Sequence, residues 1–440
     1  MKVQRMLAAV LITAVMLTGC TSLSLSGSDI LAPPKASGSR AEILNMIEQD
    51  AKGSYSLIYP DAGAYKSGII EYDIDGDGTD DAIAMYTTSD NTPRLLIATK
   101  NSDSYVLRGS VQLRSANVSE VLFADIDGDQ TGELIIGCDA HTSLSSIGAY
   151  LFENDIVSVD IAEGFNDYLI GDFDGDGSAD ILLMTPASEQ NTAKARLITF
   201  TDGIFGEMSS CEIDASIGSY VDLRTDNISE DIVGAVADGM LESGEYTTQL
   251  LYYDTAAQML VNPLFMNASY SESVRSTAVC CADIDDDGVI EVPLCSLMEH
   301  GKDEDPADVC TLTRWSVYNP DLMALSVKQD AVMCDRLGFM LMFDSEQPGA
   351  LTARYTADNA VTLYRVSYKN SEPAAGEELL TVKRYDKRSF DSSLTAEANL
   401  YESTAYTYTY ILSEGSPLTH EQIIDSFKLV EPADANNQGK

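Results

Sequence analysis

The fold is decided by a nine-residue stretch, Asp73-Ile74-Asp75-Gly76-Asp77-Gly78-Thr79-Asp80-Asp81. Acidic residues stand at its first, third, fifth and ninth positions, and glycines stand at its fourth and sixth positions. Glycine permits the positive φ angles of a sharp turn, so alternate carboxylates on such a turn can converge on one point. The stretch therefore predicts a tight loop that gathers four carboxylates, which we call the first acidic loop.

The same pattern occurs three more times, in residues 125–133, 172–180 and 283–291, which we call the second, third and fourth acidic loops. A degenerate copy lies at 222–230 and has Arg224 at its third position. Successive copies begin 52, 47, 50 and 61 residues apart. A period near fifty residues predicts one structural unit for each copy.

Short apolar runs flank each acidic loop, such as 68–72 and 82–86 around the first, and they indicate buried strands. Two more strand-like runs fit into each period, and four strands per repeat are typical of β-propeller blades. The predicted fold is all-β, a propeller of about seven four-stranded blades, with six or eight as alternatives. Runs at 338–343, 350–355, 361–367 and 379–385 could form a sixth blade, and residues 55–59 are expected to complete the last blade and close the ring.

Two short helices are expected outside the ring. Ser39 and Glu42 have the spacing of a capping box for a helix that ends before Gly53, and Thr419 and Gln422 have the same spacing near the other end. The predicted organisation is a signal peptide at 1–19, a tether at 20–38, a short helix at 39–53, a propeller at 54–412, and a C-terminal helix and tail at 413–440.

The acidic loops predict a metal. Carboxylates held this closely repel one another unless a cation lies among them. A flexible cage of oxygen ligands suits Ca²⁺ better than Mg²⁺, which loses its water reluctantly. A solvated turn would explain one copy, but four copies with acids at the same positions favour up to four calcium sites. The predicted ligands are Asp73, Asp75, Asp77, Thr79 (through its carbonyl), Asp81, Asp125, Asp127, Asp129, Glu133, Asp172, Asp174, Asp176, Asp180, Asp283, Asp285, Asp287 and Glu291.

The copies are not equally regular. Gln130 in the second loop and Asp286 in the fourth stand where the first loop has glycine. In the degenerate copy, the guanidinium of Arg224 is expected to replace the ion and to pair with Asp222 or Glu230. An EF-hand is excluded, because it requires a glutamate at position twelve and a helix on each side. Position twelve is Ala84, Ile136, Leu183 or Leu294, and strand-like runs flank every loop.

With these loops, their spacing and the run 133–137, the chain resembles FG-GAP/VCBS repeats, the propeller units also found in integrin α-subunits. The match covers about residues 55–318, and the opening 31–35 is similar to VCBS-repeat lipoproteins of Firmicutes. The literal FG-GAP peptide is absent. The resemblance implies a calcium-stabilised propeller on the cell surface, with the acids at positions one, three, five and nine as ligands. It does not fix a partner.

The N-terminus resembles a bacterial lipoprotein signal. Lys2 and Arg5 precede an apolar run that is too short to span a bilayer as a mature helix, and the run ends in Leu17-Thr18-Gly19-Cys20. This lipobox-like ending predicts lipidation of Cys20 and a place on the extracytoplasmic side of the cell membrane. An ordinary signal peptide is the alternative.

Composition narrows the partners. The 440 residues include 27 lysines and arginines and 70 aspartates and glutamates, and the net charge is −43. Such a charge disfavours nucleic acid as a partner, because no basic surface is available to displace counterions from phosphates. It also disfavours adhesion to anionic lipid, so the membrane is expected to be reached through the N-terminal lipid only.

No catalytic set is recognised in the sequence. The three histidines, His141, His300 and His420, have no motif partners, and no nucleophile elbow, phosphate loop or dinucleotide fingerprint occurs. We therefore predict that the chain is not an enzyme. Seven cysteines follow Cys20 and are expected to be buried as small apolar residues, with a disulfide between Cys295 and Cys310 as an alternative.

The predicted function is binding of a protein or glycan at the cell surface by a lipid-anchored, calcium-stabilised propeller. Two alternatives remain open: a structural subunit of an envelope complex, and a calcium-dependent polysaccharide-active enzyme such as a lyase. The alternation of Tyr406, Tyr408 and Tyr410 with threonines places three tyrosines on one strand face, which favours packing between blades over a carbohydrate-stacking surface.

Overall fold

The computed structural model describes residues 38–140, 143–152, 156–266, 268–343, 351–388, 390 and 396–430. The predicted signal peptide, nearly all of the predicted tether and Cys20 lie outside these residues. Within them the chain is mostly β and forms six antiparallel sheets with two α-helices, α3 (Ser39–Ala51) and α4 (His420–Ser426). No helix in this part of the chain is long and apolar enough to cross a membrane.

The sheets follow one another along the chain, and most are simple meanders of consecutive strands. The first contains β1 (Tyr55–Leu57), β2 (Ile69–Tyr72), β3 (Asp81–Thr88), β4 (Pro93–Asn101) and β5 (Ser104–Gln112), and the second contains β6 (Val118–Ala124), β7 (Glu133–Ala140), β8 (Ser143–Phe152) and β9 (Ile156–Phe165). The third contains β10 (Asp167–Gly171), β11 (Asp180–Thr185), β12 (Lys194–Thr201) and β13 (Ile204–Glu212), and the fourth contains β14 (Ile217–Ser229), β15 (Ile232–Leu241), β16 (Tyr246–Asp254) and β17 (Met259–Val261).

The last two sheets are larger. The fifth has the order β18-β19-β20-β21-β27 and contains β18 (Val292–Leu297), β19 (Thr311–Asn319), β20 (Ala324–Cys334), β21 (Phe339–Phe343) and β27 (Phe427–Leu429). The sixth has the order β22-β23-β24-β26-β25 and contains β22 (Leu351–Ala357), β23 (Ala360–Lys369), β24 (Glu372–Asp386), β25 (Ala398–Glu402) and β26 (Tyr406–Leu412). Short 3₁₀ turns occur at Ala268–Ser273, Pro306–Asp308 and Asp335–Leu337.

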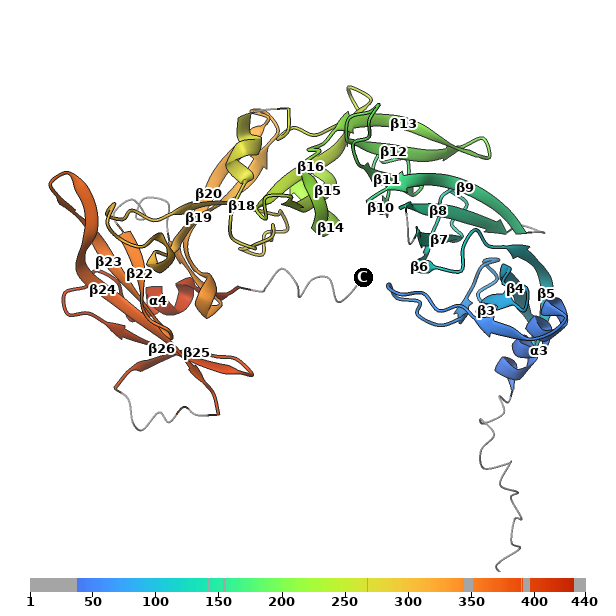
Figure 1. Cartoon of the computed structure of the whole chain (residues 1–440), viewed down its shortest axis with the longest axis horizontal. Coiled ribbons are helices and arrows are strands. Elements are labelled where there is room, and N and C mark those ends of the chain that lie inside the picture. Colours follow the sequence, from blue (N-terminus) through green and yellow to red (C-terminus); the bar gives the residue numbers. More distant parts are fainter. Residues whose placement is uncertain are drawn as a thin grey trace, which may run out of the picture.

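The six sheets stand in chain order along an open arc, with the first and sixth at its two ends (Figure 1). Neighbouring sheets pack face to face. Because alternate residues of a strand point to opposite faces, one strand can contribute apolar residues to the packing on both sides of its sheet. Ile83 and Met85 of β3 pack toward the second sheet, whereas Leu182 and Met184 of β11 pack toward the fourth. Each sheet therefore buries apolar residues against its neighbours, as expected of a repeat structure.

Within the described residues, neither end of the arc carries a further sheet. At the first sheet, Ile43 and Ile47 of α3 pack on Ala84 and Tyr86, so the helix covers the face that has no preceding sheet. At the sixth sheet, Tyr408 and Tyr410 pack toward the fifth sheet. Thr407 and Thr409 alternate with these tyrosines along β26. The neighbouring strands of the same sheet contribute three more buried threonines, Thr352, Thr362 and Thr381. An apolar face thus meets each neighbour, and a helix or polar residues end the series.

Two details of the predicted propeller need correction. Residues 55–57 do not complete the last sheet, because β1 pairs with β3 of the first sheet through Tyr55–Thr88 and Leu57–Tyr86. The described residues form six sheets, the number given as an alternative to seven, and Phe339–Phe343 joins the fifth sheet instead of opening a sixth. The physical reason is that α3 occupies the face that a closing blade would need.

The capping predictions have different outcomes. At α4, Thr419 accepts the Gln422 N–H and Gln422 accepts the Thr419 N–H, so the predicted capping box is confirmed. At α3 the N-cap is Gly38 and no side chain caps the helix, so the capping box of Ser39 and Glu42 is wrong. Glu42 instead accepts the N–H of Tyr105 from β5, at 3.1 Å.

None of the seven cysteines in the described residues forms a disulfide, so the alternative pairing of Cys295 with Cys310 is wrong. Four of them, Cys138, Cys281, Cys310 and Cys334, are buried in apolar clusters, as predicted.

Candidate metal centres

All four acidic loops share one backbone conformation. Positions four and six have positive φ in each: 71° and 85° for Gly76 and Gly78 in the first loop, and 61° and 85° for Asp286 and Gly288 in the fourth. In the second loop Gln130 adopts φ 72°, although it is not glycine. The turn predicted from the glycines is therefore present even where glycine is replaced.

Backbone N–H groups orient the carboxylates of each loop. The position-one carboxylate accepts the N–H of position six, at 2.8 Å from Gly78 to Asp73 and at 2.8 Å from Gly288 to Asp283. The position-five carboxylate accepts the N–H of position seven, for example 2.8 Å from Thr79 to Asp77. The same bonds recur in the second and third loops. These bonds hold the acids in place before any ion binds.

The position-nine acid lies beneath each loop, at the first residue of the next strand or, for Glu291, directly before it. Asp81, Glu133, Asp180 and Glu291 are at most 7% exposed. Each accepts the backbone N–H of position two, at 2.9 Å from Ile126 to Glu133 and at 3.1 Å from Phe173 to Asp180. The buried side chain of position two and the buried acid therefore fix the loop onto its sheet.

In every loop the acids of positions one, three and nine converge. One oxygen from each lies within 4.8 Å of the others in four groups: Asp73, Asp75 and Asp81; Asp125, Asp127 and Glu133; Asp172, Asp174 and Asp180; Asp283, Asp285 and Glu291. The position-five acids Asp77, Asp129, Asp176 and Asp287 do not belong to these groups. A role for them, or for the Thr79 carbonyl, as ligands stays a prediction.

The buried acids have perturbed pKa values. Burial, together with the neighbouring Asp127, Asp129 and Asp125, raises the pKa of Glu133 to about 7, against the opposing hydrogen bond from Ile126. Burial and nearby aspartates likewise raise the pKa of Asp180 to about 7. Such carboxylates are costly to ionise where they stand, and a bound cation would remove that cost. The donor set, oxygens only and partly exposed, fits Ca²⁺.

The first three loops also lie side by side. A Cβ on Gly76 would come within 3.2 Å of Thr131 Oγ1, and one on Gly128 within 3.0 Å of Ser178 Oγ. The Ala179 N–H donates to the Asp125 carbonyl at 2.7 Å. In the first two loops the glycine at position four therefore makes room for position seven of the next loop, and the three loops form a row along the first three sheets.

The fourth loop already holds a cation, the ammonium of Lys328 from β20. Its Nζ lies 2.8 Å from Asp285, 2.6 Å from Asp287 and 2.8 Å from Glu291. Burial raises the pKa of Glu291, and the hydrogen bonds from Ile284 and Lys328 oppose that rise. Bonds to the three carboxylates raise the pKa of Lys328 against the opposing effect of its burial. In the predicted fourth calcium site, one lysine ammonium therefore bonds the acids of positions three, five and nine.

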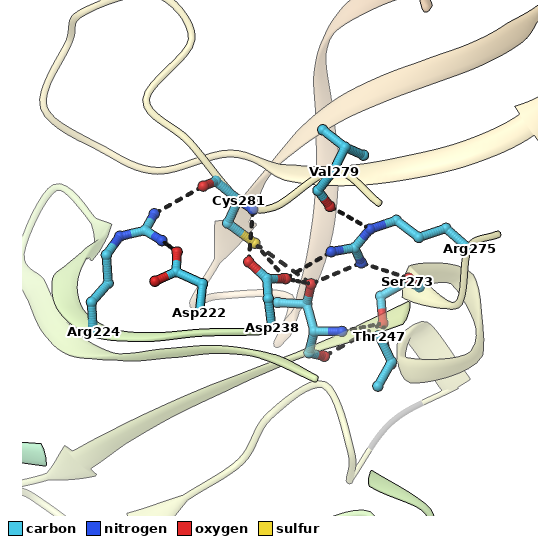
Figure 2. Close-up of polar contacts among 9 residues, drawn as sticks. Asp222, Arg224, Asp238, Thr247, Ser273, Arg275, Val279 and Cys281 are labelled. Atoms are coloured by element: carbon cyan, nitrogen blue, oxygen red, sulfur yellow. Dashed lines mark hydrogen bonds and ion pairs between the residues drawn. The ribbon is translucent and has the colours of Figure 1, made fainter. Parts of the chain in front are cut away.

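The degenerate copy forms no loop. Residues 222–229 lie within β14, which pairs with β15 as one long hairpin. With Thr225 and Asn227 in place of the two glycines, the chain stays extended. Arg224 pairs with Asp222, as predicted (Figure 2). It also pairs with Asp226, at 3.1 Å, rather than with Glu230.

A buried ion pair adjoins this hairpin. Asp238 of β15 and Arg275 are both fully buried, and their charged atoms lie 2.8 Å apart. Asp238 also accepts the Cys281 N–H at 2.8 Å, and Arg275 donates to the Val279 carbonyl at 2.8 Å (Figure 2). Asp222, Asp238 and Cys280 could geometrically hold a metal, but both aspartates already pair with guanidinium groups. The network joins the fourth sheet to the segment that leads into the fifth.

Sequence reasoning missed Lys328, Asp238 and Arg275. Lys328 lies 37 residues after Glu291, and Arg275 lies 37 residues after Asp238. Neither pair belongs to a local motif, so only the tertiary structure reveals it. Of the histidines, His300 bonds the Met298 carbonyl and His420 bonds the Tyr410 hydroxyl, while His141 lies outside the described residues.

No family model matches the chain, and no curated protein does. Among solved structures, it is similar to the exotype rhamnogalacturonan lyase YesX, with a TM-score of 0.31 and 12% identity over 70% of this chain and 69% of that one. It is also similar to the Bacillus licheniformis rhamnogalacturonan lyase PL11, with a TM-score of 0.33 and 10% identity over 74% and 77%. A third similar chain is BBS1N in complex with ARL6DN, with a TM-score of 0.27 and 8% identity over 83% and 98%.

These comparisons correct one prediction. Two of the similar chains are lyases, so the prediction that this chain is not an enzyme, which relied on absent motifs, is contradicted and is not kept. TM-scores near 0.3 assign neither an activity nor a substrate to this chain. Since no family model matches, the resemblance to FG-GAP/VCBS repeats stays a prediction.

Proposed function

We propose that this chain is a calcium-stabilised repeat protein, held at the extracytoplasmic side of the cell membrane by a lipid on Cys20, that binds a protein or glycan. One observation carries the calcium part. In the fourth loop, positions three, five and nine surround the ammonium of Lys328. Within the described residues, no basic side chain forms an ion pair with the acids of the first or third loop. The first and third loops are therefore proposed to take Ca²⁺, and the second is proposed with them because its acids converge in the same way.

The acids of positions one, three and nine would hold the ion, with position five beside them. A bound Ca²⁺ supplies positive charge at the point where these carboxylates converge. The position-nine acid begins the next strand, and position one follows the preceding strand. Binding would thus fasten two neighbouring strands of each sheet together and raise the free energy of unfolding by mass action.

The propeller is also kept as a proposal. The sheets are blade-like antiparallel meanders, and six lie in the described residues. The ring is proposed to stay open, because α3 covers the face of the first sheet on which a closing blade would pack. The arc presents a broad surface for a macromolecular ligand, as repeat proteins commonly do.

Calcium binding is tested by isothermal calorimetry of the purified protein. We expect heat of binding with dissociation constants of roughly 10⁻⁴–10⁻³ M, as for extracellular modules. An equal melting temperature in calcium and in chelator, with no binding heat, would reject the calcium proposal.

The lipid anchor is tested by labelling cells with an alkyne fatty acid. The chain should take up the label, and Cys20→Ser should abolish it and release the protein from the membrane fraction. Release without loss of label, or labelling of the Cys20→Ser chain, would contradict the assignment.

The ligand is sought on glycan arrays and by crosslinking in intact cells, each in calcium and in chelator. Calcium-dependent capture of a glycan or protein supports the binding function. The alternative, a structural subunit of an envelope complex, predicts partners that co-purify equally well in chelator.

A further inference from the structure

Lys328 occupies a special position in its strand. β19 pairs with β20 in a register that shifts between Trp315 and Ser316, which face Gln329 and Val327. Lys328 is therefore the extra residue of a β-bulge. Bulges redirect the side chain of the extra residue, and here the side chain reaches the fourth acidic loop.

The other three sheets with acidic loops have a bulge at the equivalent point, in the third strand after the loop. The register shift skips Arg108 in the first sheet, Ile161 in the second and Met208 in the third. Ile161 and Met208 carry no charge. Arg108 donates through Nε to Thr99 at 2.7 Å and forms no ion pair with the described residues of the first loop. Only the fifth sheet brings a cation from this position to its loop.

We infer that Lys328 is the built-in cation of the fourth acidic loop, so that this loop takes no divalent ion and the chain binds three calcium ions instead of four. The ammonium makes three charge-assisted hydrogen bonds at 2.6–2.8 Å to acids that a divalent ion would need. An ion entering the cage would meet the like charge of the ammonium at close range, and it would have to displace all three bonds.

The degenerate copy agrees with this division. There Arg224 pairs with Asp222 and Asp226 and donates to the Cys281 carbonyl at 2.9 Å. The first three sheets thus have metal-type loops, whereas the fourth and fifth sheets have basic side chains at the corresponding copies. Calcium is accordingly expected to make the first three sheets more ordered and to leave the loop of the fifth sheet unchanged.

The inference rests on the proposed calcium binding, and one experiment separates the two. Calcium is titrated calorimetrically into the wild-type protein and into Lys328→Met, which installs the residue type that the third sheet has at its bulge. We expect three sites in the wild type and four in the variant. The matched control is Lys302→Met, because Lys302 forms an exposed ion pair with Glu372 and should leave the count at three.

The difference between the two counts decides the inference, and the wild-type count decides the calcium proposal. Equal counts in wild type and Lys328→Met, or four sites in the wild type, overturn the role of Lys328. A wild-type count of zero rejects calcium in the first three loops, while a gain of one site in the variant would still support the inference.

Hydrogen exchange supplies a second measurement that does not depend on counting. Calcium should slow exchange in 73–81, 125–133 and 172–180 of the wild type and not in 283–291. In Lys328→Met, or in Lys328→Gln if the methionine variant does not fold, 283–291 should join the protected loops. Calcium-dependent protection of 283–291 in the wild type would overturn the inference.

Discussion

The third and fifth sheets are built alike around their acidic loops, and they differ at the bulge. Both loops have positive φ at positions four and six, and both bury the acid of position nine. The third sheet places Met208 at the bulge, and the pKa of Asp180 is raised to about 7 by burial and neighbouring acids. The fifth places Lys328 there, which bonds Glu291 directly. The difference predicts that one distant residue decides whether an acidic loop takes a metal.

The largest effect is expected at the buried ion pair of Asp238 and Arg275, which joins the fourth sheet to the segment that leads into the fifth. This effect should not depend on calcium. Asp238→Asn leaves the fully buried Arg275 without its counter-charge. Removing one partner of a buried ion pair costs about 3–5 kcal/mol in the free energy of unfolding. Urea unfolding should show this loss equally in calcium and in chelator. If stability is lost only in chelator, the ion pair depends on calcium binding in the acidic loops, which would contradict this prediction.

A matched pair of amide substitutions compares the two loops themselves. Asp180→Asn should remove the calcium-dependent stabilisation of the third loop, about 2.7 kcal/mol for one site at a calcium concentration of 100 times its dissociation constant. Glu291→Gln should keep the full calcium response of the wild type and lower stability in both solutions, because it weakens the bonds to Lys328 and Ile284. Melting temperatures with calcium and with chelator measure both changes. Equal calcium responses of the two variants would erase the distinction.

A smaller effect tests whether the end of the arc is independent of calcium. Asp50 of α3 accepts hydrogen bonds from Arg94 at 2.7 Å and Ser110 at 2.6 Å, and also from Tyr86. Burial alone would raise the pKa of Asp50, but the bonds from Ser110, Tyr86 and Arg94 outweigh it and lower the pKa. A lowered pKa gives stability above the unfolded value, near 3.9, that is lost as the pH falls through the folded value.

Asp50→Asn should therefore destabilise the protein by about 1–3 kcal/mol at pH 7, and the difference from wild type should shrink below about pH 4. Unfolding at both pH values, each with and without calcium, measures it. A constant difference across pH would show that the charge of Asp50 is not what matters.

The smallest effect concerns the second and fourth loops, each of which lacks one of the two turn glycines of the first loop. Gln130 adopts φ 72° and Asp286 adopts φ 61°. Gln130→Gly should stabilise the protein by about 0.5–1 kcal/mol by relieving the left-handed conformation. Asp286→Gly should give less, because aspartate tolerates this conformation better than glutamine does. Chemical denaturation in calcium compares the two, and a larger gain for Asp286→Gly would contradict the reasoning.

Much of the fold could be predicted because its signals are local. Runs such as 82–86 and 134–137 alternate with turn residues, and they form β3 and β7. The glycines of the loops predicted the positive φ angles that the structure shows. Ring closure could not be predicted, because it depends on which element covers the outer face of the first sheet. That element is α3, whose Ile43 and Ile47 reach Ala84 and Tyr86 only in the folded chain.

The sequence by itself determined the repeating loops, the convergence of their position-one, position-three and position-nine acids, and the pairing of Arg224 with Asp222. All of these depend on residues within nine positions of one another, so backbone geometry alone brings them together. Only the tertiary structure decided which cation faces each loop. Lys328 lies 41 residues from Asp287, and it arrives there because a bulge in β20 turns its side chain toward a loop of the same sheet.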